Sequence, residues 1–483
     1  MATDYKAYEI VVGLEVHAQL LTQSKLFCGD SSSFGAAPNT HVSAITLAHP
    51  GSLPKMNKEA IEFAVKMGLA CHCEIERENY FARKNYFYPD LPKGYQLSQH
   101  TTPICKGGYI PIKISDKEKK IRLNRIHMEE DAGKNLHDVD PENTAVDYNR
   151  AGVALVEIVS EPDLRSGDEA YAYLTELRKL VRYLEICDGN MEEGSLRCDA
   201  NVSVRKKGDE ELGTKAEIKN LNSIRNVKRA IEFEAAKMIE MLEQGLEIAQ
   251  QTKSFDSDSG ETFSIRDKED ADDYRYFADP DLTKFFLTDE FIETVRKTIP
   301  HLQAERIKKY TTEFQLSEYD ATVLTEEKGL ADYFENIISY GTKFKPTANW
   351  TLGPIKSWLN ENNSEINKFP VSPEKIAALI LMVDEGKLSF STASTKLFNE
   401  LLNNPNLEPE KIAEERNWLQ ESNTDAIASM IEQVLNKFPE KVTEYKKGKK
   451  GLMDLFVGEV MKLSKGKADP KITSDILSQK LKS

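Results

Sequence analysis

Hydrophobic and polar positions follow two different patterns along the chain. In the first ~280 residues, three runs rich in β-branched residues predict strands: 8–17, 153–159 and 196–204. Two helices are expected to interrupt them, at about 58–70 and 168–184, and a polar hairpin loop is expected at 256–261. This first region is therefore predicted to be an α+β domain with a large, mainly antiparallel sheet.

After about Asp289 the apolar positions recur at helical spacing. Ser372 and Pro373 have the character of an N-cap and a first helical residue, and Gly386 is placed to end that helix. The stretch 403–409, rich in Asn and Pro, separates this region from further helical sets at 427–435 and 453–461. Three domains are therefore predicted, at 1–290, 291–405 and 406–483.

Composition and charge narrow the class of protein. The chain has 483 residues, of which 40% are hydrophobic, and only six cysteines, so a folded cytoplasmic protein is expected. It has no apolar run of about 18 residues and no signal-peptide pattern, so no membrane segment is expected. The net charge of −15 argues against a nucleic-acid partner, but residues 446–483 contain ten Lys against four Asp and Glu. These residues either bind a polyanion or form a solvated basic tail.

Acidic residues within apolar strands are the main anomaly of the sequence. Glu15 and His17 are two residues apart, so their side chains leave the same face of a strand. Glu157 lies within Leu-Val-Glu-Ile-Val, where an unpaired carboxylate would be strongly destabilising. Residues 127–131 form a strand end that turns acidic. Carboxylates with one imidazole suit a hard cation such as Mg²⁺ that holds phosphate oxygens, and ion pairs with Arg or Lys are the alternative.

The segment 83–96 is dense in cations and aromatic rings. Its lysine could meet a phosphate and its tyrosines could stack on a base, although a tyrosine-rich loop that closes a core has the same pattern. The polar strand residues Asp199, Glu217 and Lys219 would be surface positions by pattern alone. The chain has no Walker A, dinucleotide-binding or HExxH motif, so any nucleotide is held without a P-loop. It also has no CxxC pair, which disfavours a structural zinc site.

Six sequence blocks, in this order, resemble the B-subunit family of the aspartyl/glutamyl-tRNA amidotransferases. They are Val-Gly-Leu-Glu-Val-His at 12–17, Arg-Lys-Asn-Tyr-Phe-Tyr-Pro-Asp at 83–90, His-Met-Glu-Glu-Asp-Ala-Gly-Lys at 127–134, Val-Glu-Ile-Val-Ser-Glu-Pro-Asp at 156–163, Met-Glu-Glu-Gly-Ser-Leu-Arg-Cys-Asp-Ala-Asn at 191–201 and Lys-Ala-Glu-Ile-Lys-Asn-Leu-Asn-Ser at 215–223. With a further match at 458–470, the resemblance covers nearly the whole chain.

The resemblance implies a cradle-like catalytic domain at 1–290, an all-α domain at 291–405 and a small YqeY-like domain at 406–483 that binds tRNA. It implies ATP-dependent phosphorylation of the side-chain carboxyl of Glu-tRNA(Gln) or Asp-tRNA(Asn), followed by amidation with ammonia. The ammonia would come from a separate amidase, the A subunit, which forms a heterotrimer together with a small C subunit. A tRNA-binding scaffold without catalysis is the alternative.

The resemblance also assigns residues by their positions in the blocks. It gives Mg²⁺ to His17, Glu130 and Glu157, with Glu15 and Glu129 as catalytic residues beside them. The residues that it places around ATP and the acceptor end of the tRNA are Lys84, Tyr86, Tyr88, Asp199, Glu217 and Lys219. Two departures stand out: of a cysteine quartet common in the family only Cys28 is present, and a frequent Pro-Glu is Ala278-Asp279 here.

Overall fold

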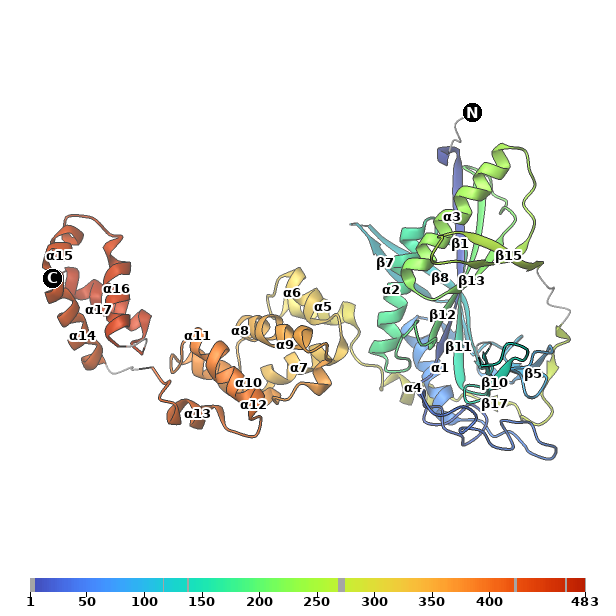
Figure 1. Ribbon diagram of the computed structural model, residues 1–483, viewed down its shortest axis with the longest axis horizontal. Coiled ribbons are helices and arrows are strands. Elements are labelled where there is room, and N and C mark those ends of the chain that lie inside the picture. The colour runs from blue at the N-terminus through green and yellow to red at the C-terminus, as the bar shows by residue number, and fades with distance from the viewer. Residues whose placement is uncertain are drawn as a thin grey trace. The chain divides into compact units, whose positions relative to one another are not determined.

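The computed structural model describes residues 5–115, 117–136, 139–267, 274–420, 424–464 and 467–482 (Figure 1). It consists of two compact units, Met1–Leu302 and Gln303–Ser483. Each unit has hydrophobic cores of its own. None of the helices in the described ranges is both long enough and apolar enough to cross a membrane.

A 13-stranded sheet forms the framework of the first unit (Figure 1). Its main path runs β15-β14-β13-β12-β1-β11-β8-β5-β4-β16, and along this path only the β13–β14 pair is parallel. The predicted α+β class with a mainly antiparallel sheet is confirmed. The strands of the sheet are β1 (Tyr8–Gln19), β2 (Glu74–Ile75), β4 (Ala82–Asn85), β5 (Tyr95–Ser98), β6 (Cys105–Lys106), β7 (Tyr109–Ile114), β8 (Lys117–Glu130), β11 (Ala154–Ser160), β12 (Leu196–Lys206), β13 (Ala216–Leu221), β14 (Gln251–Phe255), β15 (Thr262–Asp267) and β16 (Phe277–Ala278). Two small sheets pair β9 (Lys134–Leu136) with β10 (Ala145–Asp147) and β3 (Glu78–Asn79) with β17 (Phe285–Phe286).

Helices cover one face of this sheet because its strands alternate. In β1 the side chains of Val12, Leu14 and Val16 are fully buried and join one core with the helices, whereas the residues between them point to the other face. The helices of the first unit are α1 (Lys58–Ala70), α2 (Gly167–Tyr183), α3 (Ile224–Glu243) and α4 (Asp289–Arg296). One face of the sheet is therefore apolar and packed, and the other is left for polar side chains.

The expectation of only two helices before residue 280 is wrong, because α3 is a third. Its start is capped by Ser223, whose side chain accepts a hydrogen bond from the Asn226 N–H. Val227, Ile231 and Met238 then fall on its buried face. Both signals are present in the sequence. The 256–261 loop is confirmed as the connection of the β14–β15 hairpin.

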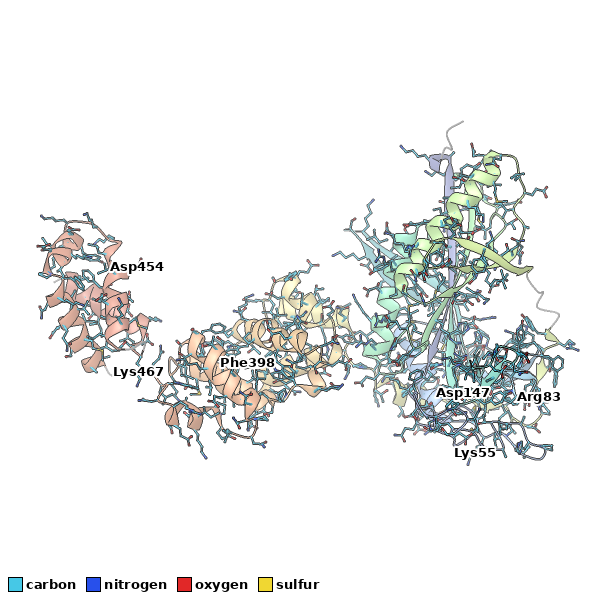
Figure 2. The ribbon with its side chains drawn as sticks, viewed as in Figure 1. Lys55, Arg83, Asp147, Phe398, Asp454 and Lys467 are labelled. Carbon is cyan, nitrogen blue, oxygen red and sulfur yellow. The ribbon has the colours of Figure 1, made fainter. Side chains whose placement is uncertain are left out.

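The second unit is helical, as predicted. Its helix α10 begins at Pro373, and Gly386 follows the helix end with a φ of 72°, which suits glycine. Phe398 packs in the core against Trp350 with ring centroids 5.9 Å apart (Figure 2). The helices are α5 (Gln303–Thr312), α6 (Glu318–Leu324), α7 (Lys328–Ser339), α8 (Phe344–Trp350), α9 (Lys356–Glu361), α10 (Pro373–Asp384), α11 (Phe390–Thr392), α12 (Phe398–Asn403), α13 (Pro409–Glu415), α14 (Thr424–Lys437), α15 (Pro439–Lys446), α16 (Leu452–Leu463) and α17 (Pro470–Lys482).

Candidate active site

The face of the sheet turned away from its helices carries a row of charged side chains. Directly opposed residues of antiparallel strands share a face. His17 of β1 is opposite Glu157 of β11, which is in turn opposite His127 of β8. Glu15 of β1 is opposite Asp199 of β12. Strand register alone therefore gathers these acidic and imidazole groups from four neighbouring strands.

His17, Glu129 and Glu157 form the first group that could hold a metal ion. One ligand atom from each lies within 4.8 Å of the others. The Nε2 atom of His17 is 3.4 Å from Glu129 Oε1 and 3.4 Å from Glu157 Oε2. Burial lowers the pKa of His17, but hydrogen bonds with Glu129 and Glu157 outweigh it and raise the pKa to about 10. Without a metal the two carboxylates therefore hold an imidazolium, and a divalent cation would take the place of its proton.

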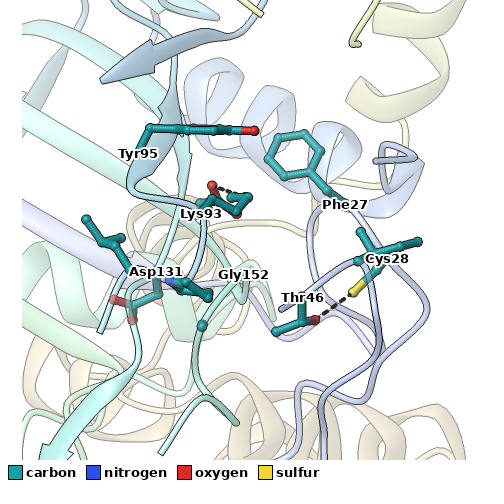
Figure 3. A pocket seen from close by; sticks show the side chains of 12 residues that line it. Phe27, Cys28, Thr46, Lys93, Tyr95, Asp131 and Gly152 are labelled. Carbon is teal, nitrogen blue, oxygen red and sulfur yellow. Dashed lines mark hydrogen bonds and ion pairs between the residues drawn. The ribbon is translucent and has the colours of Figure 1, made fainter. Parts of the chain in front are cut away.

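The position of Glu130 differs from the one expected for a metal ligand. Consecutive strand residues point to opposite faces, so Glu130 leaves the face that Glu129 occupies. Its carboxylate pairs with Lys93, and the Leu97 N–H donates to it at 2.9 Å. Glu130 and Lys93 line a pocket with Phe27 and Tyr95 on this other side (Figure 3). The structure therefore groups Glu129, and not Glu130, with His17 and Glu157.

His127 is a member of this site that was not assigned from the sequence. Its ring is almost completely buried, and its Nε2 atom is 3.2 Å from Glu157 Oε2 and 3.7 Å from Glu129 Oε2. Burial lowers the pKa of His127, but the negative charge of Glu157 and hydrogen bonds raise it to about 9. The available signal was its spacing, since His127 precedes Glu129 by two residues on one strand. Its place behind both carboxylates suits it to orient them.

Glu15, Asp199 and Glu217 form a second acidic group on the same face. Their ligand atoms also lie within 4.8 Å of one another. Lys219 donates to Asp199, and its Nζ atom is 3.1 Å from Glu217 Oε1. Burial and the neighbouring carboxylates raise the pKa of Glu15. Glu15 of β1, Asp199 of β12, and Glu217 and Lys219 of β13 are therefore brought together, with an ammonium group among the three carboxylates.

Two further cations border the first group. Lys84 of β4 is largely buried, and although burial lowers its pKa, the charge of Glu129 and its other neighbours raises it. The ammonium of Lys84 therefore stays positive beside the carboxylates of the first group. Arg197 of β12 is directly opposite His17, and its Nη2 atom is 2.9 Å from Asp131 Oδ2. Arg197 was not assigned from the sequence, although it lies within one of the family blocks.

Tyr86 and Tyr88, also expected at the site, follow Lys84 on the chain. Their ring centroids are 5.7 Å apart, and the Lys84 Nζ atom is 5.6 Å from the Tyr86 centroid. Burial, followed by the charge of Glu129, raises the pKa of Tyr86, so its phenol is neutral near pH 7. The aromatic segment therefore adjoins the site rather than lying elsewhere on the unit.

The two departures from the family pattern also have structural counterparts. Cys28 Sγ is 3.3 Å from Thr46 Oγ1 (Figure 3). In the same loop the Ser43 N–H donates to Asp30 at 2.7 Å. In the described part of the chain, neither group of metal-ligand geometry contains a cysteine. Asp279 is buried and accepts a hydrogen bond from Arg83 Nε at 2.6 Å, which links β16 to β4 beside Lys84.

Comparisons with known proteins identify the family of this chain. Residues 10–293 match the family model "GatB/GatE catalytic domain", and residues 332–481 match "GatB domain". A Thermodesulfovibrio yellowstonii protein, named as the B subunit of aspartyl/glutamyl-tRNA(Asn/Gln) amidotransferase, is 47% identical over 98% of this chain and 99% of its own. Proteins of the same name from Trichlorobacter lovleyi and Persephonella marina are 49% and 48% identical over 98% of this chain and 99% and 100% of their own. The chain belongs to the family of the B subunits of aspartyl/glutamyl-tRNA amidotransferases, which are ligases of protein biosynthesis.

Proposed function

We propose that this protein phosphorylates the side-chain carboxyl of Glu or Asp esterified to tRNA and then converts it to the amide. A carboxylate oxygen attacks the γ-phosphorus of ATP and ADP leaves, which gives an acyl phosphate. Ammonia then attacks the acyl carbon, the carbon–oxygen bond to phosphate breaks, and inorganic phosphate leaves. Phosphorylation is needed because oxide is a far poorer leaving group than phosphate, and the substrate carboxyl needs no general base because it is ionised near neutral pH.

The group of His17, Glu129 and Glu157 is the observation that carries this proposal. One imidazole and two carboxylates suit Mg²⁺, and a Mg²⁺ ion held there would neutralise charge on the phosphoryl oxygens during transfer. Lys84 and Arg197 add positive charge at the border of this group, where a polyphosphate or a carboxylate substrate must be held. Lys219 offsets part of the negative charge of the second acidic group by pairing with Asp199 and Glu217.

The reaction also needs a source of ammonia, which implies partner subunits. The relatives are named as B subunits, so the chain acts within a multi-subunit amidotransferase. We assign glutamine hydrolysis to a separate amidase, the A subunit, with a small C subunit completing a heterotrimer. The lysines near the C-terminus would hold tRNA phosphates; Lys446, Lys447 and Lys449 are exposed, whereas Lys465 lies outside the described residues.

Glu157→Gln tests the proposal, with Glu74→Gln as control because Glu74 is an exposed carboxylate of the same sheet. In the assembled enzyme we expect Glu157→Gln to lose Mn²⁺ binding and tRNA-dependent ATP hydrolysis while it keeps tRNA binding. Hydroxylamine should trap the activated carboxyl as a hydroxamate in the wild type and in Glu74→Gln. Unchanged hydroxamate formation by Glu157→Gln would contradict the metal assignment, and its absence from the wild type would favour the scaffold alternative.

A further inference from the structure

Five aromatic rings from three separate segments form a row in the first unit. Tyr88 contacts Tyr86 at a centroid distance of 5.7 Å, and Tyr86 contacts Tyr274 at 6.0 Å. Tyr274 contacts Tyr276 at 6.1 Å. Tyr276 is stacked on His100 at 3.9 Å, with the ring planes 7° apart. Tyr274, Tyr276 and His100 lie in other segments of the sequence than Tyr86 and Tyr88, and the fold brings the three segments together.

The row is adjacent to the candidate metal site. The Nζ atom of Lys84 is 4.8 Å from the ring centroid of Tyr274 and 5.6 Å from that of Tyr86. The negative charges of Glu129 and Glu157 raise the pKa of Lys84. The pairing of Ser98 with Glu129 joins β5 to β8, and His100 follows Ser98 by two residues. The pairing of β16 with β4 places the Tyr276 segment beside Lys84. The same strands that build the site therefore also position the rings.

Closing the protein core does not explain these rings. All five remain partly exposed, and none of the four tyrosines belongs to the hydrophobic core of the unit or packs against it as a peripheral member. Neighbouring tyrosines meet at interplanar angles of 66° to 75°, so the row offers several separate stacking surfaces rather than one flat wall. Rings of this kind beside a lysine are typical of surfaces that bind unpaired nucleotides.

We propose that this row binds the unpaired 3′ end of the aminoacyl-tRNA by stacking of its bases. The inference rests on the proposed function, because the amino acid is esterified to the terminal adenosine. That nucleotide must lie beside His17, Glu129 and Glu157 when the carboxyl reacts, and the preceding bases must run away from them. The base of one ATP molecule would occupy only one or two of the five rings. Lys84, which lies beside Tyr86 and Tyr274 in the middle of the row, would hold a phosphate between the stacked bases.

Tyr276→Ala in the assembled amidotransferase tests this inference. The matched variants are Tyr276→Phe, which keeps the ring, and Tyr319→Ala, which removes an exposed tyrosine of the second unit. Each would be titrated with full-length tRNA and with tRNA that lacks its 3′-terminal trinucleotide. A third tRNA would carry 2-aminopurine as its terminal base, whose fluorescence is quenched by stacking. The KM for ATP would be measured in parallel.

We expect Tyr276→Ala to bind full-length tRNA about 5- to 150-fold more weakly, which is the effect of removing one stacked base. It should bind truncated tRNA as the wild type does and should lose the quenching, whereas Tyr276→Phe and Tyr319→Ala should keep both properties. His100→Leu tests the same platform if Tyr276→Ala fails to fold. A wild-type affinity for full-length tRNA in both Tyr276→Ala and His100→Leu would overturn the inference. A raised KM for ATP in these variants, with the dependence of tRNA binding on the 3′ end unchanged, would also overturn it. Hydroxamate formation by the wild type tests the proposed function separately.

Discussion

Glu129 and Glu130 are adjacent in sequence but lie on opposite faces of β8, so their substitution by Gln should have different effects. Glu129 belongs to the proposed metal site, where its Oε1 atom is 3.4 Å from His17 Nε2. Glu130 pairs with Lys93, and the two side chains are only 4% and 16% exposed. The variants keep the size of the side chain and remove one charge each. They therefore separate the loss of a metal ligand from the loss of a buried ion pair.

The size of each effect follows from this geometry. At an effective dielectric constant of ~20, two unit charges 4 Å apart interact by ~4 kcal/mol, and a divalent cation doubles this before its dehydration is subtracted. We therefore expect Glu129→Gln to weaken Mn²⁺ binding by at least about 100-fold, which corresponds to ~2.7 kcal/mol. Glu130→Gln leaves the ammonium of Lys93 mostly buried without its partner, which should lower the free energy of unfolding by about 2–4 kcal/mol.

Titration calorimetry with Mn²⁺ and thermal unfolding of the metal-free protein measure the two quantities. Glu129→Gln should mainly lose affinity for Mn²⁺. Glu130→Gln should keep its Mn²⁺ affinity within about threefold, while its Tm falls by several degrees. Equal losses of Mn²⁺ affinity in both variants would refute the assignment of the two carboxylates to opposite faces.

Three further outcomes are expected. His127→Asn should weaken Mn²⁺ binding about 10- to 100-fold, because His127 orients Glu157 and Glu129, and calorimetry would detect an unchanged affinity as a contradiction. The pKa of His17 rises from 6.5 to about 10, so its imidazolium stabilises the metal-free fold fully below pH 6.5, and this stabilisation is lost as the pH rises through 10. Because Mn²⁺ must displace the His17 proton, its affinity should increase up to tenfold per pH unit between pH 7 and 9. An affinity that does not change with pH would argue against His17 as a ligand. Charge reversal of Lys446, Lys447, Lys449 and Lys450 should weaken tRNA binding and lower its salt slope by up to about four, whereas an unchanged slope would leave these residues a solvated tail.

Strands, helices and the polar face could largely be predicted from the sequence. Glu15 and His17, two residues apart, were expected on one face of a strand, and Glu157 stood out within an apolar run; the structure places all three on one face. The helix at 58–70 was predicted with the bounds that the structure has. These features are local, because they depend on periodicities of two and 3.6 residues within single elements.

The choice between Glu129 and Glu130 depended on information that is not local. Both follow an apolar run, and only the register of β8 against β11 decides which one shares a face with Glu157. The ring row is harder still to predict. Tyr276 and His100 are far apart in sequence, and they meet because the two-residue strand β16 pairs with β4. Strands this short have no periodicity from which to predict them.

The transfer of a labelled oxygen tests the central claim most directly. Glutamyl- or aspartyl-tRNA with ¹⁸O in the side-chain carboxyl would be incubated with the assembled enzyme, ATP and ammonia, and the products would be analysed by mass spectrometry. Phosphorylation of the carboxyl predicts one ¹⁸O atom in inorganic phosphate for each amide formed. Amide formation without ¹⁸O in phosphate, or with the label in AMP, would contradict this account.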